Sequence, residues 1–569
     1  MRHGRTAALG ALAAVLWAFF CFRWFDAALP LRPRWMAIVP PVLLLAAGVA
    51  AAALWLRARW RDIAGPSLDP SSGALWLVLG LTFLFRLPLA WQGAAGYVTP
   101  DGALSGIVAL HVRDGIDHLV FVPHVPYSGS LKSHLTAPLA ALIDPARAFA
   151  LVSVFFYMAF VAAVYRLARR AAPARRWTAL AAGLYLAFAP AFVTRYSLSN
   201  DGNYVEVLAL GTWALLLAAQ WLESGEPPAP ASAAVAGILL GLAFWSHILA
   251  AIPIAVVGLA LLAAGRRRVL GPAARLAGGL TLGYLPGLLW NAGEGWASFR
   301  YLVGAESVGA RVEGPGVGGR ALAVVADQLP VLLGYDPGYP PTIDVVFRDV
   351  AWTAVALAVL AVVLAARAAV RERSGTLKVL FLLVAVNVAV AVAALPAIPG
   401  NPRYLLPSMA AIPVFLARAL DDRLRRLAML ALVAFGAVGS LAQAVPTLRS
   451  DVQWRRFVQD LQAESVRWCF TDFYIATKIN FLSEGRVTCS SKLGPTITEY
   501  FFEFRQRVEA APDAALVAVN ATAAEKLERR LERLAVTYER RDMMKPVLLR
   551  LSRKVDPSEL FPDREFPWR

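Results

Sequence analysis

Residues 379–395 read VLFLLVAVNVAVAVAAL, an almost unbroken apolar run that approaches the ~20 residues an α-helix needs to cross a bilayer. A second run, MAIVPPVLLLAAGVAAAALWL at 36–56, reaches that length. Of the 569 residues, 58% are hydrophobic and only 17% are charged, and the charges are grouped between the apolar runs. This pattern predicts an all-α polytopic membrane protein.

Hydropathy and the charge of the connecting segments together predict about 13 transmembrane helices. The expected spans are 7–22, 36–56, 74–92, 147–165, 177–195, 203–222, 231–246, 248–264, 273–291, 349–366, 377–395, 403–418 and 426–444. Arginine-rich segments occur at alternate connections, except at ESGEPP (223–228), and these connections are therefore expected on the cytoplasmic side. The net charge of +17 follows from these short loops, so nucleic-acid binding is not expected.

The sequence divides into three expected parts. Residues 1–73 hold two extra N-terminal transmembrane helices, and residues 74–445 form the membrane core, with long external loops at 93–146 and 292–348. Residues 446–569 mix short β-like runs with helical ones and predict a small C-terminal α/β domain. A cytoplasmic N-terminus and an odd number of spans place this domain outside the plasma (inner) membrane. Cys469 and Cys489 would then form a disulfide or stay as two separate thiols.

Acidic residues stand at the external ends of two apolar segments. Asp101 follows a proline and precedes ALSGIVAL, where it could begin a helix that lies along the membrane surface. In RYSLSNDGNYVEVLALGTW (195–213), Asp201 could also cap a helix, but Glu206 lies about one turn further in. An ionisable group facing lipid at that depth costs a few kcal/mol, so Glu206 is expected to face a cavity or a partner.

Three stretches in this order resemble the GT-C glycosyltransferase superfamily. They are PDGALSGIVALHVRDGIDHLVFVPHVPYSGSLKSHLTAPLAAL, NDGNYVEVLALGTWALLLA followed by GLAFWSHILAAIPI, and NPRYLLPSMAAIPVFLARAL. More narrowly, the chain is similar to RgtA/B/C/D-like membrane glycosyltransferases and related to protein O-mannosyltransferases and aminoarabinose transferases. The resemblance implies a GT-C fold with an extracytoplasmic active site. It also implies a polyprenyl-phosphate-linked sugar donor and an envelope glycan, lipid or protein acceptor.

The resemblance implies displacement at the anomeric carbon, with a carboxylate taking the acceptor's proton. Asp101 is the first choice for this base and Asp201 the second, and Glu206 would orient the sugar or the acceptor. The phosphate of the donor needs positive charge, for which Arg403 is the first choice, with Lys132 and Arg195 next.

Three further polar residues are candidates for contact with the substrate: Tyr127, Asn203 and Tyr204. For the two tyrosines, the alternative is an interfacial aromatic belt around the membrane part.

A resident metal is not expected. The spacings between His111, His118, His124 and His134 match no compact metal-ligand pattern, and the second acidic cluster is not an Asp-x-Asp motif. A divalent ion at Asp101 and Asp201 stays open as an alternative.

Two other classes of function compete with the transferase. A secondary transporter would carry its polar groups at the bilayer midplane, whereas the acids here lie at the outer rim. A non-catalytic subunit of envelope polysaccharide assembly is the other alternative. It is favoured by Gly102 and Lys132, which stand where related enzymes often have acids. The expected partners are the lipid-linked donor, its acceptor and membrane lipids.

Overall fold

A computed structural model describes residues 2–25, 41–64, 73–199, 201–265, 269–302, 316–336, 341–394, 398–493, 499–543 and 546–561 of the chain. Helices dominate these ranges, and the strands form one short hairpin and one C-terminal sheet. The prediction of a helical membrane protein with a small C-terminal sheet is confirmed at this level. Parts of the expected external loop 292–348, at 303–315 and 337–340, lie outside the described residues.

The longer helices of the membrane part are α1 (Arg2–Trp24), α2 (Pro41–Ala64), α3 (Gly73–Gln92), α7 (Pro145–Ala171), α8 (Arg176–Ala187), α10 (Tyr204–Ser224), α11 (Pro230–Ser246), α12 (Ala251–Gly265), α13 (Leu270–Gly283), α18 (Pro341–Arg371), α19 (Gly375–Ala393) and α21 (Arg425–Ala463). Shorter elements connect them: α4 (Ala94–Tyr97), α5 (Pro100–Asp114), β1 (Phe121–Val122), β2 (Val125–Gly129), α6 (Leu131–Ala140), α9 (Ala191–Tyr196), η2 (Asp201–Asn203), η3 (Ile248–Ala250), α14 (Leu285–Gly293), α15 (Ala297–Leu302), α16 (Val317–Ala323), η5 (Val324–Gln328), α17 (Leu329–Leu332), η6 (Arg403–Ala410) and α20 (Ile412–Ala419).

Within the described ranges, eight helices are long and apolar enough to cross a membrane, and two shorter apolar helices accompany them. The expected count of about 13 spans is not confirmed. Several expected spans are broken in the middle, as at 177–195, where α8 ends and α9 begins directly after Pro190. Proline cannot donate a backbone hydrogen bond inside a helix, so the chain bends there. Hydropathy alone does not register such a break.

Close helix packing in the membrane part depends on glycine. Gly237 and Gly241 of α11 face Gly279 and Gly283 of α13, and a methyl group at any of the four would overlap backbone atoms of the other helix. Small residues spaced four apart let two helix backbones approach in this way. The spacing of these glycines, in addition to the hydrophobic pattern, therefore determines that α11 and α13 are neighbours.

The C-terminal region forms a five-stranded mixed sheet in the order β4-β3-β5-β7-β6. Its elements are β3 (Trp468–Phe470), α22 (Phe473–Leu482), β4 (Thr488–Ser490), α23 (Phe502–Ala510), β5 (Ala515–Ala518), α24 (Ala521–Arg533), β6 (Tyr538–Asp542), β7 (Val547–Leu551) and α25 (Pro557–Leu560). Strands β4, β3 and β5 run parallel, and β7 and β6 complete the sheet in antiparallel pairing. The sequence left two readings open for Cys469 and Cys489, and in the structure a disulfide joins these paired residues of β3 and β4.

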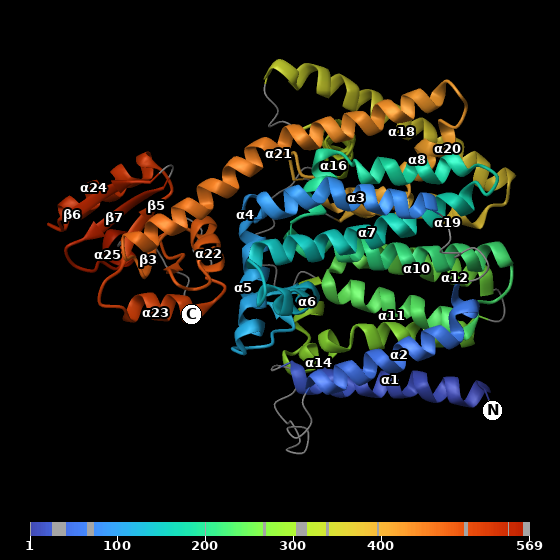
Figure 1. The fold of residues 1–569 in the computed structure, drawn as a ribbon, viewed down its shortest axis with the longest axis horizontal. Coiled ribbons are helices and arrows are strands. Elements are labelled where there is room, and N and C mark those ends of the chain that lie inside the picture. Colours follow the sequence, from blue (N-terminus) through green and yellow to red (C-terminus); the bar gives the residue numbers. More distant parts are fainter. Residues whose placement is uncertain are drawn as a thin grey trace.

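Helix α21 connects the two parts and does not end near residue 445, where the last span was expected to stop. It continues to Ala463, and Figure 1 shows it running from the membrane helices to the C-terminal sheet. The sheet region then packs on α5 through Phe481, Phe501 and Phe504. An ion pair of 2.5 Å between Arg113 and Glu484 adds to this contact.

Helix α5 is consequently a buried element. Nearly all of its residues from Gly102 to Val112 are buried, and a side chain at Gly106 would overlap the ring of Phe481. The sequence allowed this segment to lie along the membrane surface, and its place relative to a membrane stays a prediction. The apolar face that suggested lipid contact is covered by α22 and α23 instead.

Candidate functional site

Asp101 lies in the first turn of α5, at the end of the membrane part nearest the C-terminal domain (Figure 1). The helix is capped by Thr99, whose hydroxyl accepts a 3.0 Å hydrogen bond from the Gly102 amide, with Pro100 at the first helical position. The expectation that Asp101 itself might be the cap is therefore wrong. Among the described residues its carboxylate has no hydrogen bond or ion pair, which leaves it available for chemistry.

Three charged groups from distant parts of the chain influence one another here. Desolvation by the surrounding protein raises the pKa of Asp101 above the ordinary carboxylate value, and the negative charge of Asp201 raises it further. The positive charge of Arg403 acts in the opposite direction. Asp101 is nevertheless exposed to solvent. Asp101 on α5, Asp201 on η2 and Arg403 at the start of η6 are therefore near enough for the charges of the last two to act on the first.

The backbone at η2 is shaped for this approach. Gly202 and Asn203 both adopt left-handed conformations, with φ of 63° and 53°. The Asn203 side-chain amide donates hydrogen bonds to Ser128 Oγ, to the Gly129 carbonyl and to the Ser246 carbonyl, at 2.6–3.3 Å. This amide, expected from the sequence to contact substrate, is engaged in holding η2 against β2 and the end of α11. We infer that it positions Asp201.

Two ion pairs accompany the acidic residues. The Arg195 guanidinium lies 3.8 Å from the Asp201 carboxylate, with Asp201 buried and Arg195 about half exposed. Lys132 Nζ lies 3.3 Å from Glu206 Oε1, and both side chains are almost completely buried. The expectation that Glu206 faces a partner is met by Lys132 within the protein core. Both residues are therefore buried, whereas Asp101 is exposed.

Arg403 begins η6 and keeps part of its hydrogen-bonding capacity free. One guanidinium nitrogen donates to the Tyr404 hydroxyl at 3.2 Å, and the group lies 5.1 Å from the centre of that ring. Its Nε is buried and has no hydrogen-bond partner among the described residues. A half-buried guanidinium whose Nε donor is unmet is suited to receiving an anionic oxygen.

The aromatic candidates form a stack around a histidine. The rings of Tyr127 and Tyr204 lie 5.6 Å and 4.9 Å from the ring of His247, and Tyr127 also stacks on Tyr301 at 4.7 Å. His247 Nδ1 accepts a hydrogen bond from the Leu249 amide. Tyr204 is buried while Tyr127 is partly accessible, so Tyr127 is the better placed of the two to meet a substrate.

The C-terminal domain adds two residues that the sequence did not single out. The pKa of the Tyr500 hydroxyl is raised by burial and then by the charge of Asp101. Burial lowers the pKa of Lys478 to about 8, and the positive charge of Arg195 contributes to that shift. Its ammonium lies 4.2 Å from the centre of the Trp454 ring. No local motif marks either residue, because they reach this region only when α21 returns the domain to α5.

Helix α3 supplies another residue that the sequence did not mark, Arg86. This fully buried guanidinium donates to the Ala187 and Leu186 carbonyls at the end of α8 and to Ser197 Oγ. It thereby fixes the segment that leads to Asp201. Its only sequence signal is a charge inside an apolar run.

The residues present do not favour a bound divalent metal. No group of three or more metal-ligating side chains occurs in the described ranges. Asp101 and Asp201 supply two carboxylates, but Arg195 and Arg403 place positive charge beside them. His111, one of the four loop histidines, is hydrogen-bonded to Asp117 at 3.1 Å instead.

No protein-family model and no curated protein sequence matches the chain. Among solved structures, ArnT from Cupriavidus metallidurans in the apo state is similar, with a TM-score of 0.51 and 13% identity over 83% of this chain and 97% of that one. ArnT bound to undecaprenyl phosphate gives a TM-score of 0.49 at 14% identity, over 84% and 98%. The oligosaccharyltransferase AglB from Archaeoglobus fulgidus, in complex with an inhibitory peptide and a dolichol-phosphate, gives 0.44 at 12%, over 88% and 75%. ArnT is a GT-C superfamily member, and the chain has the GT-C-like fold that its motifs predict.

Proposed function

We propose that this chain is an integral membrane glycosyltransferase. It moves a sugar from a polyprenyl-phosphate-linked donor to a hydroxyl or amine acceptor on the extracytoplasmic side. The observation that carries the proposal is the unpartnered Asp101 carboxylate, electrostatically coupled to Asp201 and Arg403, within a GT-C-like fold. Donor and acceptor chemistry are the parts of the proposal that rest on the superfamily resemblance.

In the proposed reaction, the acceptor oxygen or nitrogen attacks the anomeric carbon while Asp101 removes its proton. The raised pKa of Asp101 makes this carboxylate a stronger base than an ordinary aspartate. The bond between the anomeric carbon and the phosphate oxygen breaks, and polyprenyl phosphate leaves. Since a phosphate is already a good leaving group, it needs a positive charge rather than a proton.

Arg403 is the proposed phosphate-binding residue because its Nε is buried and unpaired. Arg195 can add charge from the neighbouring segment, since it is about half exposed beside Asp201. Lys132 is a weaker candidate than the sequence suggested, because its ammonium is buried against Glu206. We therefore assign the Lys132–Glu206 pair a positioning role beneath the site.

The test follows release of polyprenyl phosphate from a panel of polyprenyl-phosphate sugars, using protein in nanodiscs and an envelope extract as the source of acceptor. Asp101→Asn should lower the rate by about 10²–10⁴-fold, the range for loss of a general base. Asp114→Asn is the matched control, because it changes a carboxylate at the other end of the same helix.

An unchanged rate in Asp101→Asn would move the base to Asp201 and contradict the assignment. If folded wild-type protein releases polyprenyl phosphate from none of the donors, the transferase proposal fails. The transporter and assembly-subunit readings would then take its place.

A further inference from the structure

A second candidate site lies in the C-terminal domain, at a reversal in the order of its parallel strands. From β3 the chain crosses through α22 to β4 on one side, and it later returns to β5 on the other side of β3. Beyond the carboxyl ends of β3 and β5, the two connections therefore diverge. Ligands of open α/β sheets bind in the crevice at such a switch point.

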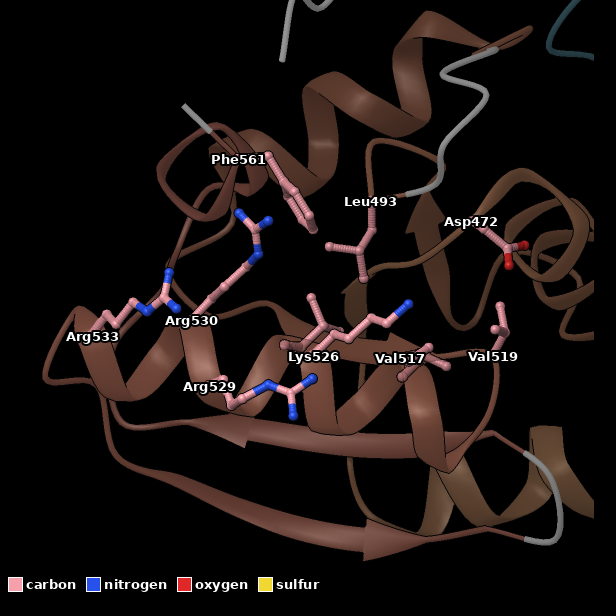
Figure 2. A pocket seen from close by; sticks show the side chains of 12 residues that line it. Asp472, Leu493, Val517, Val519, Lys526, Arg529, Arg530, Arg533 and Phe561 are labelled. Atoms are coloured by element: carbon pink, nitrogen blue, oxygen red, sulfur yellow. The ribbon is translucent and has the colours of Figure 1, made fainter. Parts of the chain in front are cut away.

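A cavity of about 360 Å³ occupies this position. Its wall includes Asp472, which follows β3, and Ala518 and Val519 at the end of β5. Figure 2 shows Phe561 and Leu493 on one side of the cavity and helix α24 on the other. This volume lies at the lower end of the range for small-molecule sites, ~300–1,000 Å³.

Four basic residues of α24 line the cavity: Lys526, Arg529, Arg530 and Arg533. Their spacing of three, four and seven residues places them on one face of the helix. The acidic residues of α24 centre on the adjoining face of the helix, where Glu528 forms an ion pair of 3.1 Å with Arg540 of β6. Among the described residues that line the cavity, the only acid is Asp472, whose carboxylate accepts a 2.9 Å hydrogen bond from the Ile475 amide to cap α22.

The four basic side chains differ in their contacts. Arg530 donates to the Leu560 carbonyl and lies 4.2 Å from the centre of the Phe561 ring, so it holds that ring in the cavity wall. Lys526, Arg529 and Arg533 have no hydrogen-bond or ion-pair partner among the residues that the structure describes. Figure 2 shows Arg533 at one end of the cavity and Lys526 nearer its centre.

We propose that this cavity binds an anionic saccharide, one that carries carboxylate or phosphate groups on its sugar rings. Guanidinium and ammonium groups would bind the anionic oxygens. The floor formed by Val517, Ala518 and Leu527 and the ring of Phe561 would contact the apolar faces of the sugar. Ala523 in the same wall belongs to the first turn of α24, which begins at Ala521 and carries the positive end of the helix dipole.

This second site does not include Asp101 or the residues whose charges act on it. Figure 1 shows α24 on the side of the domain away from α5. Binding there does not depend on the proposed transferase activity and is measured without it. A glycan held by the domain would be kept near the membrane without occupying the candidate active site.

The test measures binding to the full-length protein in nanodiscs by isothermal titration. The probes are an oligogalacturonate, glucose 1-phosphate, inorganic phosphate and neutral maltotriose. The oligogalacturonate, glucose 1-phosphate or both should bind, and both neutral maltotriose and phosphate alone should bind at least about tenfold more weakly. Raising the salt concentration should weaken the binding.

The double variant Lys526→Ala with Arg529→Ala removes two cations and should reduce affinity about tenfold or more. Val519→Trp narrows the cavity at a partly exposed position and should reduce affinity to a similar extent. Arg507→Ala on α23, an exposed cation outside the cavity, is the matched control and should bind like the wild type. Equal binding of maltotriose would overturn the proposal. So would equal binding of phosphate alone, an absence of binding to every probe, or full affinity in both cavity variants with an unchanged melting temperature.

Discussion

The buried pair of Lys132 and Glu206 offers the sharpest test of how the protein supports its candidate site. Lys132 Nζ lies 3.3 Å from Glu206 Oε1, and the Ser199 carbonyl lies 3.5 Å from the same ammonium. Neither Glu206 oxygen has a hydrogen bond of good geometry, so the charge of Lys132 is its main compensation. Glu206→Leu and Lys132→Met each leave one charge buried without its partner.

The expected loss of stability follows from the distance between Lys132 Nζ and Glu206 Oε1. At 3.3 Å and an effective dielectric constant near 20, two unit charges attract by about 5 kcal/mol. Removing one member of a buried pair costs roughly 3–5 kcal/mol, because the other charge stays desolvated. The double variant removes both charges and replaces them with apolar groups, so its free energy of unfolding should lie within about 1 kcal/mol of the wild type.

The assay is reversible unfolding in mixed micelles for the wild type, the two single variants and the double variant. The exposed pair of Arg425 and Asp422, at 3.1 Å, serves as the control. The corresponding single and double variants of that pair should give an interaction energy of less than about 1 kcal/mol, as surface ion pairs do. The reasoning is refuted if each buried single variant costs less than about 1 kcal/mol, or if the double variant loses the sum of the two single losses.

The same variants separate a positioning role from a catalytic one. If Glu206 only positions the segment that carries Asp201, the double variant should regain most of the release of polyprenyl phosphate. If Glu206 contacts the substrate, activity should stay low although stability returns.

Three further outcomes follow from the structure. Because the negative charge of Asp201 raises the pKa of Asp101, Asp201→Asn should move the acidic limb of the pH–rate profile to lower pH; a shift to higher pH would contradict the coupling. Burial raises the pKa of Glu499 from 4.5 to about 7, so the folded domain holds a proton that the unfolded chain releases. The resulting stabilisation is fully present below pH 4.5 and is lost as the pH rises from 4.5 through about 7. The free energy of unfolding of the domain should fall by up to about 3 kcal/mol over this pH range, and the melting temperature of Glu499→Gln should depend little on pH there. Breaking the disulfide between Cys469 and Cys489, which are 20 residues apart, should destabilise the domain by about 3 kcal/mol in denaturant titrations with and without reductant. Unchanged stability after reduction would contradict that value.

Local patterns were enough to identify the membrane helices but not their interruptions. Apolar length and loop charge gave correct positions for α10 and α19, because hydration and lipid contact act on each segment separately. The breaks between α8 and α9 and between α13 and α14 divide segments that hydropathy treats as continuous. A break is stable only where neighbouring helices satisfy the freed backbone groups, and that is a property of the packed protein.

The candidate site shows the same division. Its candidate residues Asp101, Asp201 and Arg403 were conspicuous in the sequence because charged residues beside apolar runs are costly. The partner of Glu206 was not readable, because Lys132 lies 74 residues earlier on a separate helix. The cap of α5 was misassigned because Thr99 and Asp101 are both good capping residues, and only the backbone geometry distinguishes them.

The sequence by itself determined the solvent that each segment meets and the kinds of side chain at the external ends of the spans. Those properties depend on composition within a window of about 20 residues. Only the tertiary structure decided that α21 carries the C-terminal domain back onto α5, where Tyr500 comes under the influence of Asp101. It also decided that the basic face of α24 closes a cavity at the strand reversal. Both depend on contacts between residues far apart in the chain, and no local pattern encodes them.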